Sequence, residues 1–582
     1  MAHDTKVTRF GGSLAFALLL YGPASLAAPP DAGSLLRQQE QLERLPARQF
    51  PEAEASVPER AMPTPEEGMT IRVREIRFSG AMTLAPEGEL RAVVGDAVGQ
   101  DLDFNGLKRL ADRITGYLKG KGYLLARAYL PPQDVSEGIV EFALVEGKLE
   151  EGGGWYISPD EGTRVDPALL AAIAQAGTPP GGVPKETDLE RVLLLMNDLP
   201  GVRASARIEP GEQTGTSRIV VNVAREPFLQ SNLQANNFGS YNTGSETLNA
   251  RFDLNNPLRM GDHVGVLATA SEGVRFIRMG YDVPIGVRGM RASANYTDMR
   301  YEVREGTGRT VGLEGKSGII QLGLRYPVIR SRAVNLAAGL DLGRKNIQDD
   351  SDAGILRDKR VKYLALGLDG STLDGWGGGG INSARVALTA GDLDLSHAPA
   401  DETADQGSLR TQGTYRVLRG NISRLQRLPE NFSVLGRVSA QWGSKNLDSS
   451  EEFIMGGPAG VRAYPVGEAQ GDEGWLANLD LRYDVPGGTP WGRLQVSTFV
   501  DAGRIRMHDN PGDTAIATAT GNNRYSLYGW GIGVGLSKPK SHSVRLSWAS
   551  KIGGNDGRDT DGNDADGKDN RNRFWLQAAY QF

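Results

Sequence analysis

Apolar and polar residues alternate with a period of two through most of the second half of the chain. In Leu494–Gly503, Val496 and Val500 fall on one face and Phe499 and Asp501 on the other. Because successive side chains of a β-strand point to opposite faces, this pattern predicts strands with one apolar and one polar face. A soluble β-sandwich produces the same alternation, so a single strand does not separate the two classes of protein.

The block as a whole is more informative than any one strand. From residue 226 to 582 the helical periodicity disappears, and short alternating runs are separated by Gly, Asn, Asp and Ser. At about 22 residues for a strand and its loop, this block predicts a C-terminal antiparallel transmembrane β-barrel of about 16 strands. A barrel satisfies its backbone hydrogen bonds by closing on itself, which lipid requires.

The last predicted strand ends at the C-terminus. In Arg573–Phe582, Tyr580 and Phe582 share the apolar face, and Trp575 lies on the opposite face. This ending resembles the terminal strand by which outer-membrane proteins are recognised for assembly, so Tyr580 and Phe582 are candidates for that signal. We expect the strand to close the barrel against the chain near Phe228. The alternative is an ordinary strand that ends in Phe.

The first half of the chain shows a different periodicity. Residues 69–147 and 148–225 each follow the order strand, helix, helix, strand, strand, with apolar positions sufficient for a small α+β core. In the first unit, strands are expected over 71–78, 123–130 and 139–145 and helices over 90–94 and 105–119; in the second, helices over 169–174 and 187–199 and strands over 202–208 and 217–223. The chain is thus predicted to be multi-domain.

The N-terminus has the pattern of a secretory signal peptide. Residues 1–27 combine Lys6 and Arg9 with a short apolar run and small residues that favour cleavage after Ala27. The alternative, a membrane-anchoring helix, is less favoured because the run is shorter than the ~20 residues of a span. Residues 28–68 are polar and proline-rich, and within them Gly33–Leu45 is predicted to be helical.

Composition excludes several classes of function. The chain has no Cys, so disulfides, thiolate catalysis and thiolate metal sites are excluded. The net charge of −6 does not favour nucleic-acid binding. The five His form no ligand pair, and no P-loop motif occurs, so we expect no metal, no cofactor and no ATP site. The Asp-rich segment Arg558–Asn570 fails the Ca²⁺-loop pattern and is expected to be a solvated loop.

Two groups of motifs in the first half carry a resemblance to a known family. Ala128–Asp134 (AYLPPQD) with Gly138–Glu146, and Leu193–Val202 with Pro210–Thr216, resemble the two POTRA domains of TpsB transporters in the Omp85 superfamily, such as the filamentous haemagglutinin and haemolysin transporters. POTRA domains capture unfolded polypeptide by offering a sheet edge. The resemblance implies that Tyr129, Leu130, Pro131 and Pro132 mark the substrate-binding edge.

Two further motifs lie in the barrel block. Gly456–Trp475 is similar to the superfamily's long inward-folding loop, near 454–475, with Val461, Arg462, Ala463 and Tyr464 at its tip, followed by Gly471 and Asp472. Phe499, Asp501 and Gly503 match the family's Phe-x-Asp-x-Gly strand motif. The resemblance implies an Arg462–Asp501 pair inside the lumen. Ala463 replaces the usual Gly, and would be strained if the position needs a positive φ.

The resemblance implies a non-enzymatic outer-membrane pore with periplasmic POTRA domains. Such a pore secretes an unfolded, β-helix-forming TpsA-like exoprotein of the adhesin or haemolysin type. The other partners implied are outer-membrane lipids and, during biogenesis, the barrel-assembly machinery. The helix at 33–45 resembles the family's plug. An Omp85-type assembly factor (insertase) is the alternative. An enzyme barrel is a third hypothesis, but no nucleophile–base motif and hence no catalytic residue is found.

Overall fold

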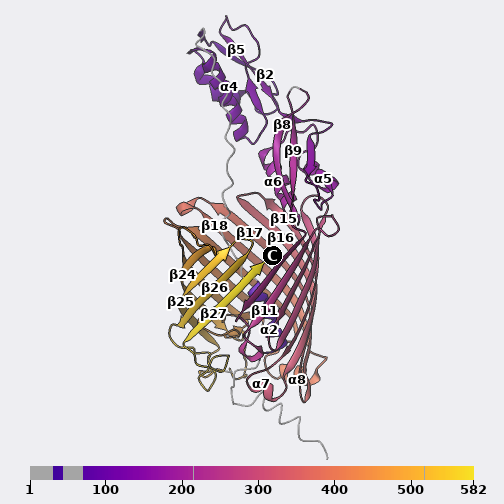
Figure 1. Cartoon of the computed structure of the whole chain (residues 1–582), viewed down its shortest axis with the longest axis vertical. Helices are drawn as coiled ribbons and strands as arrows, with labels where there is room; N and C mark the ends of the chain where they lie inside the picture. The colour runs from indigo at the N-terminus through magenta and orange to yellow at the C-terminus, as the bar shows by residue number, and fades with distance from the viewer. Residues whose placement is uncertain (1–29, 44–69, 214, 517) are drawn as a thin grey trace, which may run out of the picture.

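The computed structural model describes residues 30–43, 70–213, 215–516 and 518–582. Two α+β modules follow one another and lead into a closed β-barrel, which encloses one helix, α2 (Figure 1). The expected signal peptide, residues 1–27, and most of the proline-rich segment lie outside the described residues. Within the described ranges, no helix has the length and apolar character needed to cross a membrane.

The first module has the expected order of elements. The Asp103 carboxylate begins α4 by accepting a hydrogen bond from the Gly106 N–H at 2.7 Å. Leu90, Ile114 and Phe142 are buried between the helices and the sheet. The elements are β1 Ile71–Arg72, β2 Glu75–Gly80, α3 Glu87–Val94, η1 Gly95–Ala97, β3 Asp101–Leu102, α4 Phe104–Gly120, β4 Arg127–Tyr129 and β5 Ile139–Val145, with sheet order β2-β5-β4.

One strand of this module is shorter than expected. A strand was predicted over residues 123–130, but β4 contains only Arg127–Tyr129. Gly122 turns the chain with a φ of 90°, and Tyr123 then forms a bridge with Lys185 of the second module. The apolar residues before β4 therefore belong to a turn at the junction of the modules.

The second module repeats the fold. Leu170, Met196 and Ile219 are fully buried in its core. Its last helix rests on the barrel, where Asp198 forms a bidentate ion pair with Arg330 at 2.7 and 2.8 Å. The elements are β6 Lys148–Leu149, β7 Trp155–Pro159, α5 Pro167–Gly177, α6 Glu186–Asn197, β8 Val202–Pro210 and β9 Thr216–Arg225, in a sheet where β9 pairs with β6, β7 and β8.

The barrel has sixteen antiparallel strands, which confirms the predicted fold class. They are β10 Leu229–Asn236, β11 Thr247–Asn255, β12 His263–Ala270, β13 Val274–Ile285, β14 Met290–Glu302, β15 Glu314–Arg330, β16 Val334–Ser351, β17 Gly354–Asp374, β18 Gly380–Asp394, β19 Gly413–Arg427, β20 Phe432–Gly443, β23 Glu473–Asp484, β24 Arg493–Arg506, β25 Arg524–Lys538, β26 His542–Lys551 and β27 Asn572–Gln581. The connections contain η2 Tyr241–Thr243, α7 Thr307–Thr310, η3 Trp376–Gly378, α8 Pro399–Gln406, β21 Phe453–Ile454 and β22 Gln470–Gly471.

The last strand closes the barrel on the first, as expected. Asn232–Asn236 of β10 pair with Gln577–Gln581 of β27. Phe582 extends the pairing, because its N–H and its carbonyl both hydrogen-bond to the backbone of Ser231 at 3.1 Å. The rings of Tyr580 and Phe582 stack at 5.9 Å on the outer surface.

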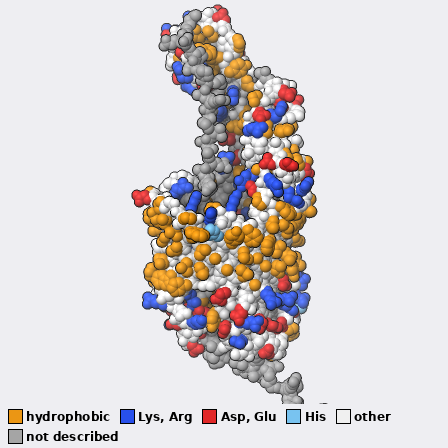
Figure 2. All heavy atoms as spheres, viewed as in Figure 1, with side chains coloured by type: hydrophobic (Ala, Val, Ile, Leu, Met, Phe, Trp, Pro, Cys, Tyr) orange, Lys and Arg blue, Asp and Glu red, His pale blue; other side chains and the backbone are white. Residues whose placement is uncertain are grey.

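The alternation read from the sequence separates the two surfaces of the barrel wall. On β24, Val500 is 51% exposed, whereas its neighbours Phe499 and Asp501 are 2% and 0% exposed. Outward-facing apolar side chains form a belt across the face of the barrel that Figure 2 shows, with charged residues above and below it. This is the surface that a lipid bilayer requires of a membrane barrel.

Helix α2, Ala32–Glu43, lies inside the barrel (Figure 1). Ala32, Leu35 and Leu36 are buried against the inner wall, in one cluster with Met299 and Ile347. On another side, Gly33 lies against Ser449 and Ser450 of the segment after β20, so the N-terminal half of the helix is enclosed and its polar residues are buried too.

The Asp-rich segment 558–570 is only in part the solvated loop that its sequence predicts, since residues 567–570 are exposed but three of its carboxylates are buried. Asp559, Asp564 and Asp566 are at most 6% exposed. Lys551 of β26 pairs with Asp564 at 2.7 Å, and Arg573 of β27 pairs with Asp566 at 2.8 Å. Cations at the strand ends therefore draw the loop onto the barrel. Nowhere in the described ranges do three or more His, Cys, Asp or Glu side chains form a group suited to a metal ion.

Candidate functional site: the inward-folded loop

The segment between β20 and β23 folds into the barrel. Its two short strands form a hairpin in which Phe453 pairs with Gly471. The tip beyond this hairpin is enclosed, since Val461, Ala463 and Tyr464 have no exposed surface. These side chains form one apolar cluster with inward-facing residues of the barrel wall. The wall therefore fixes the position of the tip.

Arg462 is the polar anchor of the tip. Its Nη2 and Nε donate to the two oxygens of Asp501 at 2.6 and 2.9 Å, and its backbone N–H donates to the same carboxylate at 3.0 Å. Its Nη1 donates to Asp480 of β23 at 2.8 Å. Such bidentate, charge-assisted bonds fix orientation as well as position. The Arg462–Asp501 contact implied by the resemblance is therefore present.

Each residue of the Phe-x-Asp-x-Gly motif has a separate physical role. The Phe499 ring lies under the Arg462 guanidinium, 3.4 Å from ring centroid to Cζ, in a cation–π arrangement. Asp501 supplies the carboxylate. A Cβ at Gly503 would lie 2.7 Å from the sulfur of Met455 and 3.1 Å from the Trp475 carbonyl oxygen, so glycine lets the base of the loop pack closely against β24.

Three residues of this site were missed from the sequence. Asp480 is the second carboxylate, Asn478 donates to Asp501 at 2.7 Å and to the Gly460 carbonyl at 3.0 Å, and the Trp575 indole N–H donates to the Arg462 carbonyl at 2.7 Å. The alternation of 473–484 places Asn478 and Asp480 on the inward face. It does not reveal which inward residues meet the loop.

Ala463 is not strained, contrary to the concern raised by its departure from the usual Gly. The non-glycine residue with a positive φ in this loop is Ala469, at 57°, and Ala463 does not have one. Room for the methyl group comes from the opposite wall. A Cβ built on Gly529 of β25 would lie only 2.7 Å from the Ala463 Cβ. The missing side chain at Gly529 thus accommodates the extra carbon at Ala463.

Gly471 and Asp472 fix the end of the loop. A Cβ at Gly471 would lie 2.4 Å from the Arg506 carbonyl oxygen, so this position requires glycine. Asp472 accepts hydrogen bonds from the backbone N–H groups of Leu447 and Asp509 at 2.8 and 2.7 Å. Burial raises the pKa of the Asp472 carboxyl to about 7 despite these donors.

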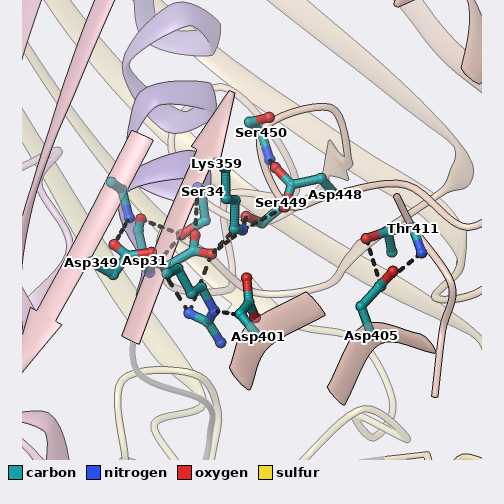
Figure 3. A network of polar contacts seen from close by, with 12 residues as sticks. Asp31, Ser34, Asp349, Lys359, Asp401, Asp405, Thr411, Asp448, Ser449 and Ser450 are labelled. Atoms are coloured by element: carbon teal, nitrogen blue, oxygen red, sulfur yellow. Dashed lines mark hydrogen bonds and ion pairs between the residues drawn. The ribbon is translucent and has the colours of Figure 1, made fainter. Parts of the chain in front are cut away.

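The N-terminus of α2 is held by a buried polar network (Figure 3). Asp31 accepts from the Ser34 N–H at 2.8 Å and from the Ser449 hydroxyl at 2.7 Å, and lies 3.5 Å from the Lys359 ammonium. Asp349 of β16 accepts from the Ala32 N–H at 2.9 Å. The network joins the helix to the barrel wall and to the segment that leads into the loop.

Further contacts tie α2 to the base of the loop. Arg37 donates to the Glu452 carbonyl at 3.3 Å and Gln41 to the Ile454 carbonyl at 3.2 Å. Glu451 is buried and pairs with Lys345 and Arg419 of the wall, each at 2.8 Å. The helix and the loop therefore form one assembly inside the barrel.

Only part of the predicted substrate-binding edge of the first module, Tyr129 to Pro132, is free to pair with another strand. Tyr129 ends the edge strand β4 and is 48% exposed, while Leu130 packs against the core. Pro131 and Pro132 lead the chain away from the sheet. Gln133 then returns and exchanges two hydrogen bonds with the Glu141 backbone, at 2.7 and 2.8 Å, which covers the edge of β5.

Comparison with known proteins agrees with this architecture. Residues 215–536 match the sequence model of a family described as haemolysin secretion/activation protein ShlB/FhaC/HecB, and residues 71–147 match the ShlB-type POTRA domain. The heme/hemopexin transporter protein HuxB of Haemophilus influenzae (strain 86-028NP) is 24% identical over 563 residues, 95% of each chain. The outer membrane transporter CdiB of Escherichia coli O6:K15:H31 (strain 536 / UPEC) is 24% identical over 535 residues, 89% of this chain and 86% of that protein.

A solved structure gives the same result for the fold. The structure of CdiB from Escherichia coli matches 96% of this chain and 100% of its own, with a TM-score of 0.69 at 21% identity. At that identity the match shows a shared fold.

Proposed function

The chain belongs to the haemolysin secretion/activation (ShlB/FhaC/HecB) family of transporter proteins, and we propose from this that its barrel is the pore through which one exoprotein partner is secreted. Transporters of this TpsB type mediate two-partner secretion, and the protein lies in the outer membrane with its POTRA modules in the periplasm. One observation supports the role most directly. A closed barrel carries an internal loop clamped by Arg462 between Asp480 and Asp501.

The cargo is proposed to be an unfolded, β-helix-forming exoprotein that binds the POTRA modules by β-augmentation. In that mode main-chain hydrogen bonds hold an added strand with little demand on its sequence. The sheet edges that support this are β2 with six residues and β8 with nine, because β4 has only three. The binding edge predicted around Tyr129 is therefore proposed to be a minor part of the surface.

Transport is proposed to need displacement of α2 and the loop, which together occupy the lumen. The buried contacts of Asp31 and Glu451 support a resting state in which the helix acts as a plug. The barrel itself is proposed to depend on the barrel-assembly machinery for insertion. The alternative role of an assembly factor is less supported, because the similar proteins are transporters by name and two POTRA-like modules are present.

The test is reconstitution of secretion. The chain and a candidate secreted partner would be expressed together in a Gram-negative host, and the partner measured in the culture medium. We expect export only when both are present, and loss of export when the first N-terminal domain of the partner is removed. Export of the partner at the same level without this chain would contradict the proposal.

A further inference from the structure

A cavity of about 950 Å³ lies in the barrel at the end that faces the second module. It is bounded on that side by Ile173 and Leu199 of the module and by Arg37 and Gln41 of α2, and elsewhere by the barrel wall and the base of the inward-folded loop. Because the POTRA modules lead into it, a polypeptide that enters the barrel from the periplasm meets this cavity first.

The charge of the cavity is opposite to that of the chain. The protein carries a net charge of −6, yet seven arginines line the cavity among its described residues, against three carboxylates. Arg330 and Arg419 are each matched by one carboxylate, Asp198 and Glu451. Arg37 and Arg291 are likewise matched, by Glu40 and Asp282, so the excess of positive charge lies with the other three arginines.

The first unbalanced group spans three strands. Arg325 of β15 and Arg385 of β18 both approach Asp369 of β17, each at 3.4 Å. One carboxylate thus serves two guanidinium groups, whose side chains are 56% and 50% exposed. Their remaining donors face the solvent inside the barrel.

The second unbalanced group lies around Asp480. This carboxylate is already bonded by Arg462 at 2.8 Å, and Arg437 of β20 approaches it at 3.5 Å. Arg482 and Arg545, from β23 and β26, add two more positive charges to the same neighbourhood. The excess of positive charge therefore continues from the cavity toward the site of the loop.

We propose that this cavity is a binding site for carboxylate side chains, and that it guides acidic segments of an extended polypeptide into the pore. The inference rests on the proposed secretion function and adds the chemistry of the cargo. Arginine suits the task because it stays charged at all relevant pH values and binds carboxylates bidentately. Several partly solvated sites bind weakly enough to pass a chain from one to the next.

The first experiment measures ion selectivity and needs no cargo. The full-length protein is reconstituted in a planar bilayer of neutral lipids under a steep KCl gradient, and the reversal potential of its openings is recorded. We expect selectivity for chloride. Arg325→Gln with Arg385→Gln is expected to reduce it, and Asp369→Asn to increase it. A cation-selective or unselective wild-type pore overturns the proposal.

The second experiment measures block of the current by peptides added on the POTRA side. We expect polyglutamate to block the pore and polylysine of the same length not to do so. The double variant loses about tenfold in affinity for polyglutamate, which corresponds to two partly exposed ion pairs. The matched control, Arg91→Gln with Arg113→Gln on helices α3 and α4 of the first module, removes two comparably exposed arginines and keeps the wild-type affinity. Equal block by both peptides, or a control that loses as much affinity, overturns the proposal.

The outcome is separable from that of the proposed function. Secretion of the partner by a pore that neither selects anions nor binds polyglutamate overturns this inference and leaves the proposed function intact. Anion selectivity without secretion of any partner contradicts the proposed function instead.

Discussion

At the scale of single residues, Arg462 carries the site because each of its polar groups has a partner. The guanidinium joins two carboxylates from adjacent strands, the backbone N–H also bonds Asp501, and the carbonyl accepts from Trp575. A buried ion pair of this kind acts mainly by fixing the position of the loop tip. Removing either side leaves an uncompensated charge, at a cost of about 3–5 kcal/mol.

We therefore expect Arg462→Ala and Asp501→Ala each to reduce secretion strongly while the barrel still assembles. Arg462→Lys restores the charge without the bidentate geometry and is expected to recover only part of the activity. Secretion is measured in the medium, and assembly by the heat-dependent migration of the barrel on gels. The control is Arg113→Ala on helix α4, which breaks an exposed pair with Asp96. Normal secretion by both alanine variants would rule out the role of the pair.

The contact between Ala463 and Gly529 gives a second prediction at this scale. Gly529→Ala places a Cβ 2.7 Å from the Ala463 Cβ, an overpacking that costs about 1–3 kcal/mol. Adding Ala463→Gly removes the clash, so the double variant is expected to be more stable than Gly529→Ala alone. The free energy of coupling from the four proteins, measured by thermal unfolding, tests this. Additive effects would mean that the two residues do not share this space.

At the scale of elements, period-two alternation predicted the barrel strands and the inward direction of Phe499 and Asp501. It did not predict Asn478, Asp480 or Trp575 as partners, because alternation assigns a face but not the residues that approach it from a distant segment. Alternation likewise did not predict that α2 lies enclosed in the barrel. A polar helix sequence is typical of an exposed helix, but the lumen of a barrel is itself polar.

The network around Asp31 predicts how α2 is released. Asp31→Ala removes the helix cap, worth about 1 kcal/mol, and the contacts with Ser449 and Lys359. We expect more frequent channel openings in planar bilayers, and the largest increase from deletion of residues 28–50. Gln39→Ala, which removes one hydrogen bond of 3.3 Å to Thr269, serves as the control. Resting conductance that stays unchanged after the deletion would refute the plug.

The raised pKa of Asp472 gives the loop a pH dependence. Between the ordinary pKa of 3.8 and about 7, the seated loop keeps a proton that the released loop gives up. The seated state is therefore most favoured at low pH and loses stability as the pH rises to about 7. Protease accessibility of the loop should increase from pH 5 to pH 8. Asp472→Asn is expected to be less stable throughout and to show a smaller rise, because burial also raises the pKa of Glu468 in the same loop to about 7. An equal rise in the variant would assign the whole effect to Glu468 or another group.

At the scale of the whole molecule, the barrel depends on one short seam. Strands β10 and β27 pair over five residues, whereas β16 and β17 pair over eighteen. Phe582 lengthens this seam by its two backbone bonds to Ser231, so the C-terminal residue is structural as well as a proposed recognition signal. The sequence predicted the strand and its lipid face from alternation. The number of residues that pair across the seam depends on the register of the two strands, which alternation does not determine.

Deletion of Phe582 separates the two roles. Loss of its two backbone bonds, about 1 kcal/mol each, is expected to lower the thermal stability of the assembled barrel, and loss of the signal is expected to lower its amount in the outer membrane. Phe582→Ala keeps the backbone bonds and removes only the ring. If it lowers the amount but not the stability of the barrel, the ring acts in recognition. If it matches wild type in both, while the deletion lowers stability, the residue acts only by closing the seam, and the assembly signal must lie elsewhere in β27.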